Sequence, residues 1–256
     1  MQACFARERT ALLALEGAAA RGLVPRLIAS GARQGGAANW PLLLLQPCGQ
    51  SLPSWVAECV AASAASSSGG GGGGSSGGGG GSAGKAVCAA RAACASAVVK
   101  RLLDALEAAH AASLVHCDVR PSNVVVVRGA GAMLVDWGIS RASGEEARDC
   151  GVAAYADRRV FEQGSYQARP AQDVTGALLT WLCVAHSEQC DAPWRTTGAL
   201  ETLFDARAAW LTQRSGEDAA VAGVVAALRQ VEERRSWAGS ESALYALARR
   251  ALSSGV

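Results

Sequence analysis

Hydrophobic residues recur at helical spacing in two stretches of the first half of the chain. Over residues 7–20 they fall on one helical face, and from Val98 to Leu106 they repeat at i, i+1, i+4, i+5 and i+8. This spacing predicts two amphipathic helices, the first ending near Gly22 and the second near His110.

Short apolar runs predict strands on both sides of the second helix. Residues 24–29 and 42–45 flank a glycine-rich stretch, and residues 124–127 and 133–135 flank a Gly-Ala-Gly turn. Runs of this length, rich in Val, Leu and Ile and bounded by glycine, are typical of buried strands. A short helix is predicted over residues 53–62.

Beyond residue 172 the pattern is helical to the end of the chain. Four helices are predicted, over residues 173–185, 198–213, 217–229 and 240–252. A front part that mixes helix and strand, followed by a mainly helical back part, predicts the α+β class.

Residues 61–85 consist almost entirely of Ala, Ser and Gly. Such a segment buries little apolar surface against the entropy cost of ordering it, so we expect a flexible linker. It divides the chain into residues 1–60 and residues 86–256. Because long surface insertions cost little closure entropy, the linker is also compatible with an insertion that has no role of its own.

Composition excludes several classes of function. Among 256 residues the formal net charge is only +2, with no basic block, which argues against nucleic acid as a partner. The nine cysteines form no CxxC pair, so a zinc site or redox dithiol is not supported and reduced thiols are expected. No apolar run is long enough to cross a bilayer. We therefore expect an intracellular protein, cytoplasmic or nuclear, with no membrane partner.

The stretch from His116 to Asn123 carries the most specific chemistry. It places Asp118, Arg120 and Asn123 on one loop, and Asp136-Trp137-Gly138 follows after the two predicted strands. Two carboxylates, one cation and one amide can hold metal-bound nucleotide phosphates and orient a hydroxyl group. The order resembles the catalytic loop (HxDxKPxN) and metal-binding loop (DFG) of eukaryotic-type protein kinases.

Other segments extend this resemblance. Residues 8–15 resemble the C helix of that family, and residues 42–52 its fifth strand and hinge, in the style of casein-kinase-like or fungal-type kinase-like enzymes. Residues 151–156 match the GTxxYA segment that seats the substrate, and residues 173–178 resemble the F helix. The resemblance implies a two-lobe fold, N-terminally truncated and divergent. Its reduced small lobe (C helix, fourth and fifth strands, hinge) occupies residues 1–60, and its helical large lobe residues 86–256.

The resemblance also implies roles for individual residues. Asp118 is the expected catalytic carboxylate, and Arg120 stands where the family has a Lys that contacts the transferred phosphoryl group. Asn123 and Asp136 are the expected Mg²⁺ ligands. The expected contacts to ATP come from four positions: Glu8, Gln46, Cys48 and Val125.

Several neighbours have structural roles in this interpretation. Cys117 replaces the Arg that grips a phosphorylated loop, so control by loop phosphorylation is not expected. Trp137 replaces Phe and is expected to pack under the C helix and against His116. Asp173 is expected to be buried and to accept backbone N–H bonds from the catalytic loop, and His110 to be an ordinary helix-end residue.

Two parts of the family machinery do not occur in the sequence. No glycine-rich phosphate loop precedes a strand, and Glu8 has no lysine partner from a preceding strand. Either the chain is a truncated form of a longer kinase, or it is a kinase-like protein without small-lobe function. Activity is accordingly expected to be impaired if present.

Three functions therefore remain open. The first is a serine/threonine kinase-like domain that transfers the γ-phosphoryl group of ATP to a protein Ser/Thr hydroxyl, and the second is an inactive pseudokinase binding module. The third is a small-molecule phosphotransferase of the aminoglycoside or choline type, against which Pro121 and residues 151–155 argue. The substrate, the pathway and the oligomeric state do not follow from the residues.

Overall fold

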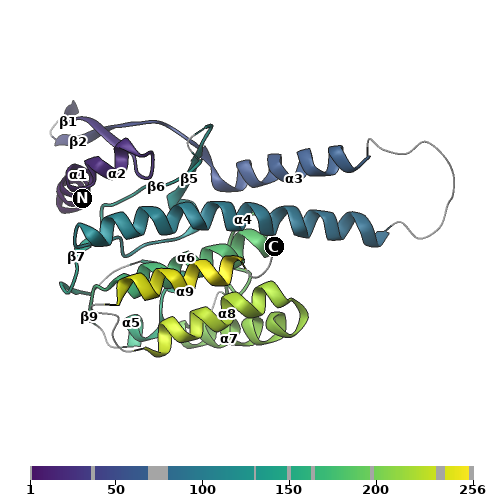
Figure 1. Ribbon diagram of the computed structural model, residues 1–256. Coiled ribbons are helices and arrows are strands. Elements are labelled where there is room, and N and C mark those ends of the chain that lie inside the picture. Colours follow the sequence, from purple (N-terminus) through teal and green to yellow (C-terminus); the bar gives the residue numbers. More distant parts are fainter. Residues whose placement is uncertain are drawn as a thin grey trace.

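The computed structural model describes residues 2–35, 38–68, 80–129, 131–148, 151–162, 165–196, 199–234 and 240–253. Within these ranges the chain combines helices with small antiparallel sheets, consistent with the predicted α+β class. Figure 1 shows helix α4 (Gly80–Ala111) running across the middle of the molecule, with the N-terminal hairpin above it and the C-terminal helices below it.

The first segment forms two helices and a hairpin. Helices α1 (Gln2–Ala14) and α2 (Glu16–Ala20) precede strands β1 (Arg26–Gly35) and β2 (Ala38–Gln46), which pair antiparallel. Both strands are longer than predicted, because pairing between them supplies hydrogen bonds that no apolar run reveals. Alternate residues of β2 face opposite sides: Leu43 packs on the core, whereas Leu44 is 59% exposed.

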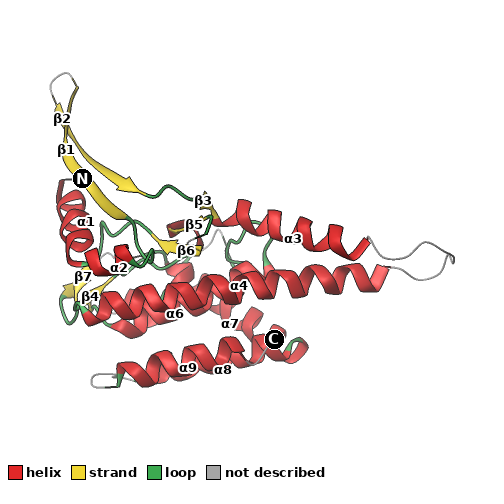
Figure 2. Cartoon of the chain, turned by 45° about the horizontal axis from the view of Figure 1, so that its top comes forward, coloured by secondary structure: helices red, strands yellow, loops and turns green. Residues whose placement is uncertain are grey.

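The predicted flexible linker over residues 61–85 is wrong at both ends. Helix α3 (Leu52–Ser68) runs through its first part, and helix α4 (Gly80–Ala111) begins within its last part. Alanine has the highest helix propensity, so these Ala-rich ends continue the flanking helices. Residues 69–79 lie outside the described residues. Figure 2 shows α3 lying alongside α4.

Short sheets surround the loops that carry the sequence motifs. Strands β3 (Gln50–Ser51), β5 (Val124–Val127) and β6 (Gly131–Leu134) form one sheet in the order β3-β5-β6. Strand β4 (Leu114–Val115) pairs with β7 (Arg141–Ala142), and β8 (Glu146–Ala147) pairs with β9 (Tyr166–Gln167). Single 3₁₀ turns, η1 (Pro121–Asn123) and η2 (Ala153–Tyr155), lie in the connecting loops.

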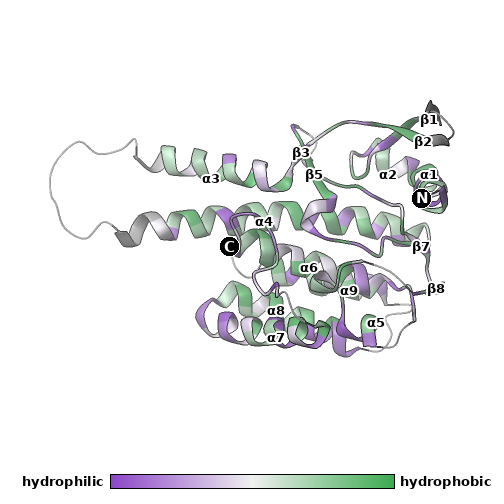
Figure 3. Cartoon of the chain, turned by 180° about the vertical axis from the view of Figure 1, so that it is seen from behind, coloured by the Kyte–Doolittle hydropathy of each residue, from purple (hydrophilic) through white to green (hydrophobic). Residues whose placement is uncertain are grey.

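In the helical part the last four helices follow the predicted ones closely, whereas the first, short helix was not predicted. This part comprises α5 (Arg158–Glu162), α6 (Pro170–His186), α7 (Leu200–Glu217), α8 (Ala219–Glu233) and α9 (Glu241–Ser253). Every residue of α6 from Asp173 to Ala185 is buried, and this helix contacts α4, α8 and α9. In Figure 3 hydrophilic residues mark much of the outer helix α7, whereas strand β5 is hydrophobic.

Leucines of α6 supply much of the core. Leu178, Leu179 and Leu182 have no exposed surface, and burying each one stabilises the fold by roughly 1.5–3 kcal/mol. Helix α6 thereby becomes a rigid support for the loops packed on its first turns. No helix within the described ranges is long and apolar enough to cross a bilayer.

Candidate active site

Asp173, in the first turn of α6, holds the loop that follows β4. Its Oδ2 atom accepts the backbone N–H of His116 at 2.7 Å, and its Oδ1 atom accepts that of Cys117 at 2.9 Å. Asp173 is 1% exposed. The prediction that this buried carboxylate binds the catalytic-loop backbone is confirmed. Cys117 takes a left-handed conformation with φ of 67°, which turns the chain sharply before Asp118.

His110 is not the ordinary helix-end residue that the sequence predicts. Its Nε2 atom lies 2.8 Å from Oδ2 of Asp173, and its Nδ1 atom is hydrogen-bonded to the hydroxyl of Tyr245 in α9. With the Tyr245 hydroxyl as donor, Nδ1 accepts and Nε2–H donates to the carboxylate. A buried chain of side chains therefore runs from α9 through α4 to the start of α6. The sequence gives no signal for it, because the partners lie on separate helices.

His116 is fully buried beneath the Asp136 loop. Its Nε2 atom is 3.0 Å from the carbonyl oxygen of Val135, and the backbone N–H of Asp118 donates to its Nδ1 atom at 3.2 Å. Burial lowers the pKa of His116, although three nearby carboxylates, first Asp173 and then Asp118 and Asp136, oppose that effect. Since Nδ1 accepts a backbone N–H and Nε2 donates to a carbonyl oxygen, the imidazole joins the two loops and orients both. Trp137 packs edge-on against it with ring centroids 4.6 Å apart, as predicted.

Asp118 is the centre of a hydrogen-bonded group. Its Oδ2 atom accepts from Nε of Arg120 at 3.0 Å and from Nδ2 of Asn123 at 2.9 Å. The same amide nitrogen donates to the backbone carbonyl of Asp118. The other carboxylate oxygen, Oδ1, is buried and has no hydrogen-bond partner among the described residues. Asp118 therefore keeps one oxygen able to accept a proton or a hydrogen bond.

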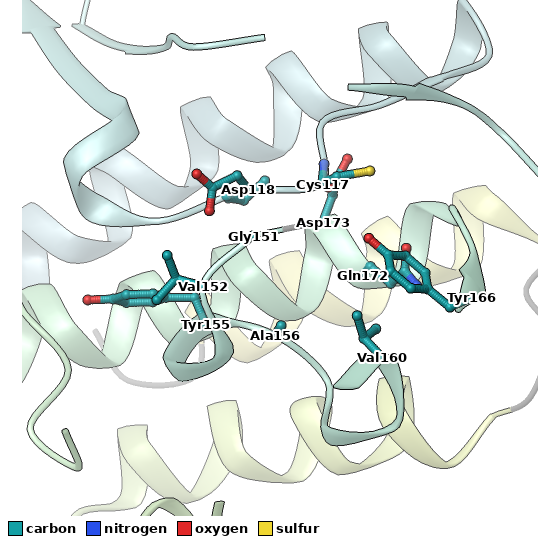
Figure 4. A pocket seen from close by; sticks show the side chains of 11 residues that line it. Cys117, Asp118, Gly151, Val152, Tyr155, Ala156, Val160, Tyr166, Gln172 and Asp173 are labelled. Carbon is teal, nitrogen blue, oxygen red and sulfur yellow. The ribbon is translucent and has the colours of Figure 1, made fainter. Parts of the chain in front are cut away.

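Gly151 lies directly against this loop. A Cβ atom at Gly151 would approach the carbonyl oxygen of Cys117 to 2.6 Å and Oδ1 of Asp118 to 3.5 Å, and the φ of Gly151 is 73°. A small cavity of about 20 Å³ remains between the loop and the turn that follows Gly151. Figure 4 shows Asp118, Gly151, Val152 and Tyr155 around it. That volume admits one water or one hydroxyl group.

Strand pairing brings Asp136 to the same end of the sheet as Asn123. Val124 pairs with Leu134, and the backbone N–H of Val135 donates to the carbonyl of Asn123 at 2.9 Å. Asp136 has a φ of 63° and is exposed, whereas Asn123 is 4% exposed. The left-handed turn at Asp136 lies where β6 ends.

The donor set of this end of the sheet fits Mg²⁺. No group of three or more His, Cys, Asp or Glu side chains is arranged to hold a metal in the part of the chain described. Mg²⁺ needs fewer protein ligands, since it retains waters and shares phosphate oxygens. The exposed carboxylate of Asp136 and the amide oxygen of Asn123 are of the hard type that it prefers.

Glu8 of α1 reaches the same loop. Its carboxyl group is half-buried, and its pKa is raised first by burial and then by Asp136, while a hydrogen bond from the backbone of Trp137 acts in the opposite direction. Glu8 therefore faces the Asp136 loop.

The other positions expected to contact ATP are less closely tied to this group. Gln46 and Cys48 are exposed and make no side-chain hydrogen bond to it within the described residues. Val125 lies on β5, paired with Ser51 and Met133. The residues brought together by hydrogen bonds are thus Asp118, Arg120 and Asn123.

A second group, which sequence reasoning missed, anchors the turn at residues 151–156. The hydroxyl of Tyr155 donates to Asp191 at 2.8 Å, and the indole N–H of Trp194 donates to the carbonyl of Ala154 at 3.0 Å. Arg207 of α7 donates to the carbonyl of Ala156 at 2.6 Å. The Tyr of the GTxxYA-like segment was the only signal for this group, since its partners come from segments with no motif.

Comparison with known proteins gives partial matches. No protein-family model matches the chain. Serine/threonine-protein kinase PknD of Mycobacterium tuberculosis is 32% identical over 106 residues, which cover 41% of this chain and 15% of that protein. Serine/threonine-protein kinase PknH of Mycobacterium bovis is 42% identical over 52 residues, 20% of this chain and 9% of that protein. A probable serine/threonine-protein kinase of Streptomyces coelicolor is 34% identical over 85 residues, 30% of this chain and 13% of that protein.

These matches support a kinase-like domain with a kinase-like function at a coarse level. The chain spans about a seventh or less of the length of these curated relatives.

Proposed function

We propose that this chain is a serine/threonine kinase-like domain that transfers the γ-phosphoryl group of ATP to a hydroxyl of a protein substrate. The observation that carries the proposal is the Oδ1 atom of Asp118, which is buried without a hydrogen-bond partner among the described residues, in a residue that also lines a cavity large enough for one hydroxyl group. Its partner atom Oδ2 is fixed by Arg120 and Asn123, so the carboxylate is held in one orientation. Asp118 then orients the attacking hydroxyl and accepts its proton.

Arg120 balances negative charge next to that carboxylate. Asp118 uses only the Nε atom of Arg120, and the Arg120 side chain is 30% exposed, so its remaining N–H groups are available to a ligand. Guanidinium groups bind phosphate oxygens with two parallel hydrogen bonds. In this role Arg120 stabilises charge on the transferred phosphoryl group.

Asn123 and Asp136 are the proposed Mg²⁺ ligands. The metal, when bound, neutralises charge on the nucleotide phosphates. Glu8, Gln46, Cys48 and Val125 are the proposed nucleotide contacts. The proposal includes the two-lobe arrangement, with a small lobe in residues 1–60 and a large lobe in residues 86–256, and the casein-kinase-like or fungal-type subtype.

A pseudokinase that acts as a binding module is the second candidate. The position of Glu8 favours it: its carboxyl faces Trp137 and Asp136, and its raised pKa reflects burial beside another acid. If this position of Glu8 deprives the nucleotide of one preorganised charge contact, the rate of phosphate transfer falls by a factor of about 10²–10³. Under this alternative Asp118 and Asn123 support the loop without catalysis.

Phosphate transfer from γ-labelled ATP tests the proposal directly. The wild-type chain is incubated with Mg²⁺ and casein, and in parallel with a panel of amino-sugars and choline. Label on casein that disappears in Asp118→Asn supports protein phosphorylation, whereas label on the small molecules supports the small-molecule type. No transfer, with no thermal shift at millimolar Mg²⁺-ATP, supports the binding module.

A further inference from the structure

A second cavity, of about 260 Å³, opens beside Arg120. Its walls come from four places in the chain: Pro53 at the start of α3, the loop 120–122, the turn 152–155 and the segment 189–195. It is smaller than the pockets that enclose a whole small-molecule ligand. Its size is suited to a single side chain of a larger partner.

Asp191 and Arg195 form the charged wall of this cavity. Oδ1 of Asp191 accepts from the Tyr155 hydroxyl at 2.8 Å and from the backbone N–H of Ala192 at 2.8 Å. Its Oδ2 atom accepts from Nη1 of Arg195 at 2.7 Å. Burial disfavours the ionised form of Asp191, but these donors outweigh it and hold its pKa below the ordinary value. The carboxylate oxygens are therefore already in use, and Asp191 fixes Arg195 in place.

Two guanidinium groups consequently offer the unused donors of the cavity. Arg195 is 68% exposed, and Asp191 is its partner through one nitrogen. Arg120 likewise uses Nε for Asp118. Neither arginine has another side-chain acceptor among the described residues. Both are pre-oriented by carboxylates, which reduces the entropy lost when they bind a ligand.

We propose that this cavity binds an anionic side chain of the protein substrate, a carboxylate or a phosphorylated hydroxyl, close to the residue that is phosphorylated. Arg195 is the residue that determines this preference. The inference rests on the proposed function in that it names the substrate class of the same site. The two proposals differ in what they require, since anion binding needs the guanidinium group of Arg195 and does not need phosphate transfer.

Peptide binding without nucleotide tests the inference separately from catalysis. Fluorescent Ala-rich peptides with one central Ser carry a single Asp, phosphoserine, Ala or Lys at each position from three before to three after that Ser. Their affinities are measured by anisotropy for wild type, Arg195→Glu and Arg195→Lys, with inorganic phosphate as a competitor. Arg229→Glu is the matched control, since Arg229 is exposed on α8 and does not line the cavity.

The expected result is a preference of about tenfold for Asp or phosphoserine over Ala at one or two positions, as one charge-assisted contact provides. Arg195→Glu removes that preference, Arg195→Lys retains part of it and Arg229→Glu leaves it intact. Equal or undetectable binding of all peptides overturns the inference, and so does a preference that survives in Arg195→Glu. Displacement by inorganic phosphate with no peptide preference also overturns it. A preference for acidic peptides in a protein that transfers no phosphate contradicts the proposed function and supports the inference.

Discussion

The Oδ2 atom of Asp173 lies 2.7 Å from the backbone nitrogen of His116, a residue 57 positions earlier in the chain. The Oδ1 atom of the same carboxylate binds the next backbone N–H, that of Cys117. A buried side chain on the rigid helix α6 thus fixes the backbone that presents Asp118. Loop geometry at this site is a consequence of core packing.

Replacing Asp173 should therefore be costly. In Asp173→Ala, two backbone N–H groups and His110 lose their common acceptor in the interior, so the free energy of unfolding should fall by about 3–5 kcal/mol. Urea unfolding followed by circular dichroism measures this change. Asp104→Ala, at an exposed ion pair with Arg249, should cost about 1 kcal/mol or less. Similar losses in the two variants would contradict the anchoring role.

Tyr245→Phe tests the outer end of the same chain of side chains. The change removes only the hydroxyl bonded to Nδ1 of His110, so the buried nitrogen loses its donor. We expect a loss of about 1–2 kcal/mol in the free energy of unfolding, with the secondary structure unchanged. His110→Phe should remove most of the additional effect of Tyr245→Phe. Additive losses in this double-mutant cycle would argue against coupling.

Asp118→Asn should separate catalysis from folding. The amide keeps the shape of the side chain but accepts protons poorly, so phosphate transfer to casein should fall by about 10²–10⁴. The melting temperature should change little, since one side-chain oxygen has no hydrogen bond to lose. Asp104→Asn, on the side of α4 that pairs with Arg249 of α9, is the control and should retain activity. An active Asp118→Asn protein would remove Asp118 from the proposed role.

Gly176 of α6 tests how closely the helix supports the loop. A Cβ atom at this position would lie 2.6 Å from the backbone carbonyl oxygen of Val119, which has little freedom to move. Gly176→Ala should cost about 1–3 kcal/mol by overpacking. Gly216→Ala in α7, where no atom lies within 4 Å of the added Cβ, should be neutral or stabilising. A neutral Gly176→Ala protein would show that the loop and helix separate easily.

Stability should depend on pH through the buried His116 and the half-buried His186. Burial lowers the pKa of both His116 and His186 below 6.5. At pH values between the lowered pKa of the folded state and 6.5, the unfolded chain binds more protons than the folded chain. The contribution of these histidines to the free energy of unfolding is therefore fully present above pH 6.5 and is lost as the pH falls below it. Urea unfolding from pH 7.5 to 5 should show this fall.

His186→Gln should weaken the dependence of the free energy of unfolding on pH. The Nε2 atom of His186 is buried with no hydrogen bond inside the described part of the chain, and its ring packs against Trp181 and Trp210. Removing the titrating group should reduce the slope of stability against pH while His116 retains the remainder. An unchanged slope would mean that His186 does not titrate in this range.

Features that depend on interactions between residues close together in the chain were predictable from the sequence. The helix containing Val98 to Leu106 and the strand Val124–Val127 were predicted from local hydrophobic spacing, which one segment carries by itself. Asp118, Arg120 and Asn123 meet because they share one short loop. Both ends of the predicted linker are helical instead, because alanine favours helix even where little apolar surface is buried.

The sequence alone determined most of the longer helices, the strand Val124–Val127 and which charged groups share the loop before β5, because hydrophobic periodicity and short-range spacing act over a few residues. Only the tertiary structure decided that His110 joins Tyr245 to Asp173, that Asp191 orients Arg195, and that Gly151 encloses Asp118. Each of these contacts joins segments far apart in the chain. Their partners are chosen by how the helices pack, and that choice depends on the whole core at once.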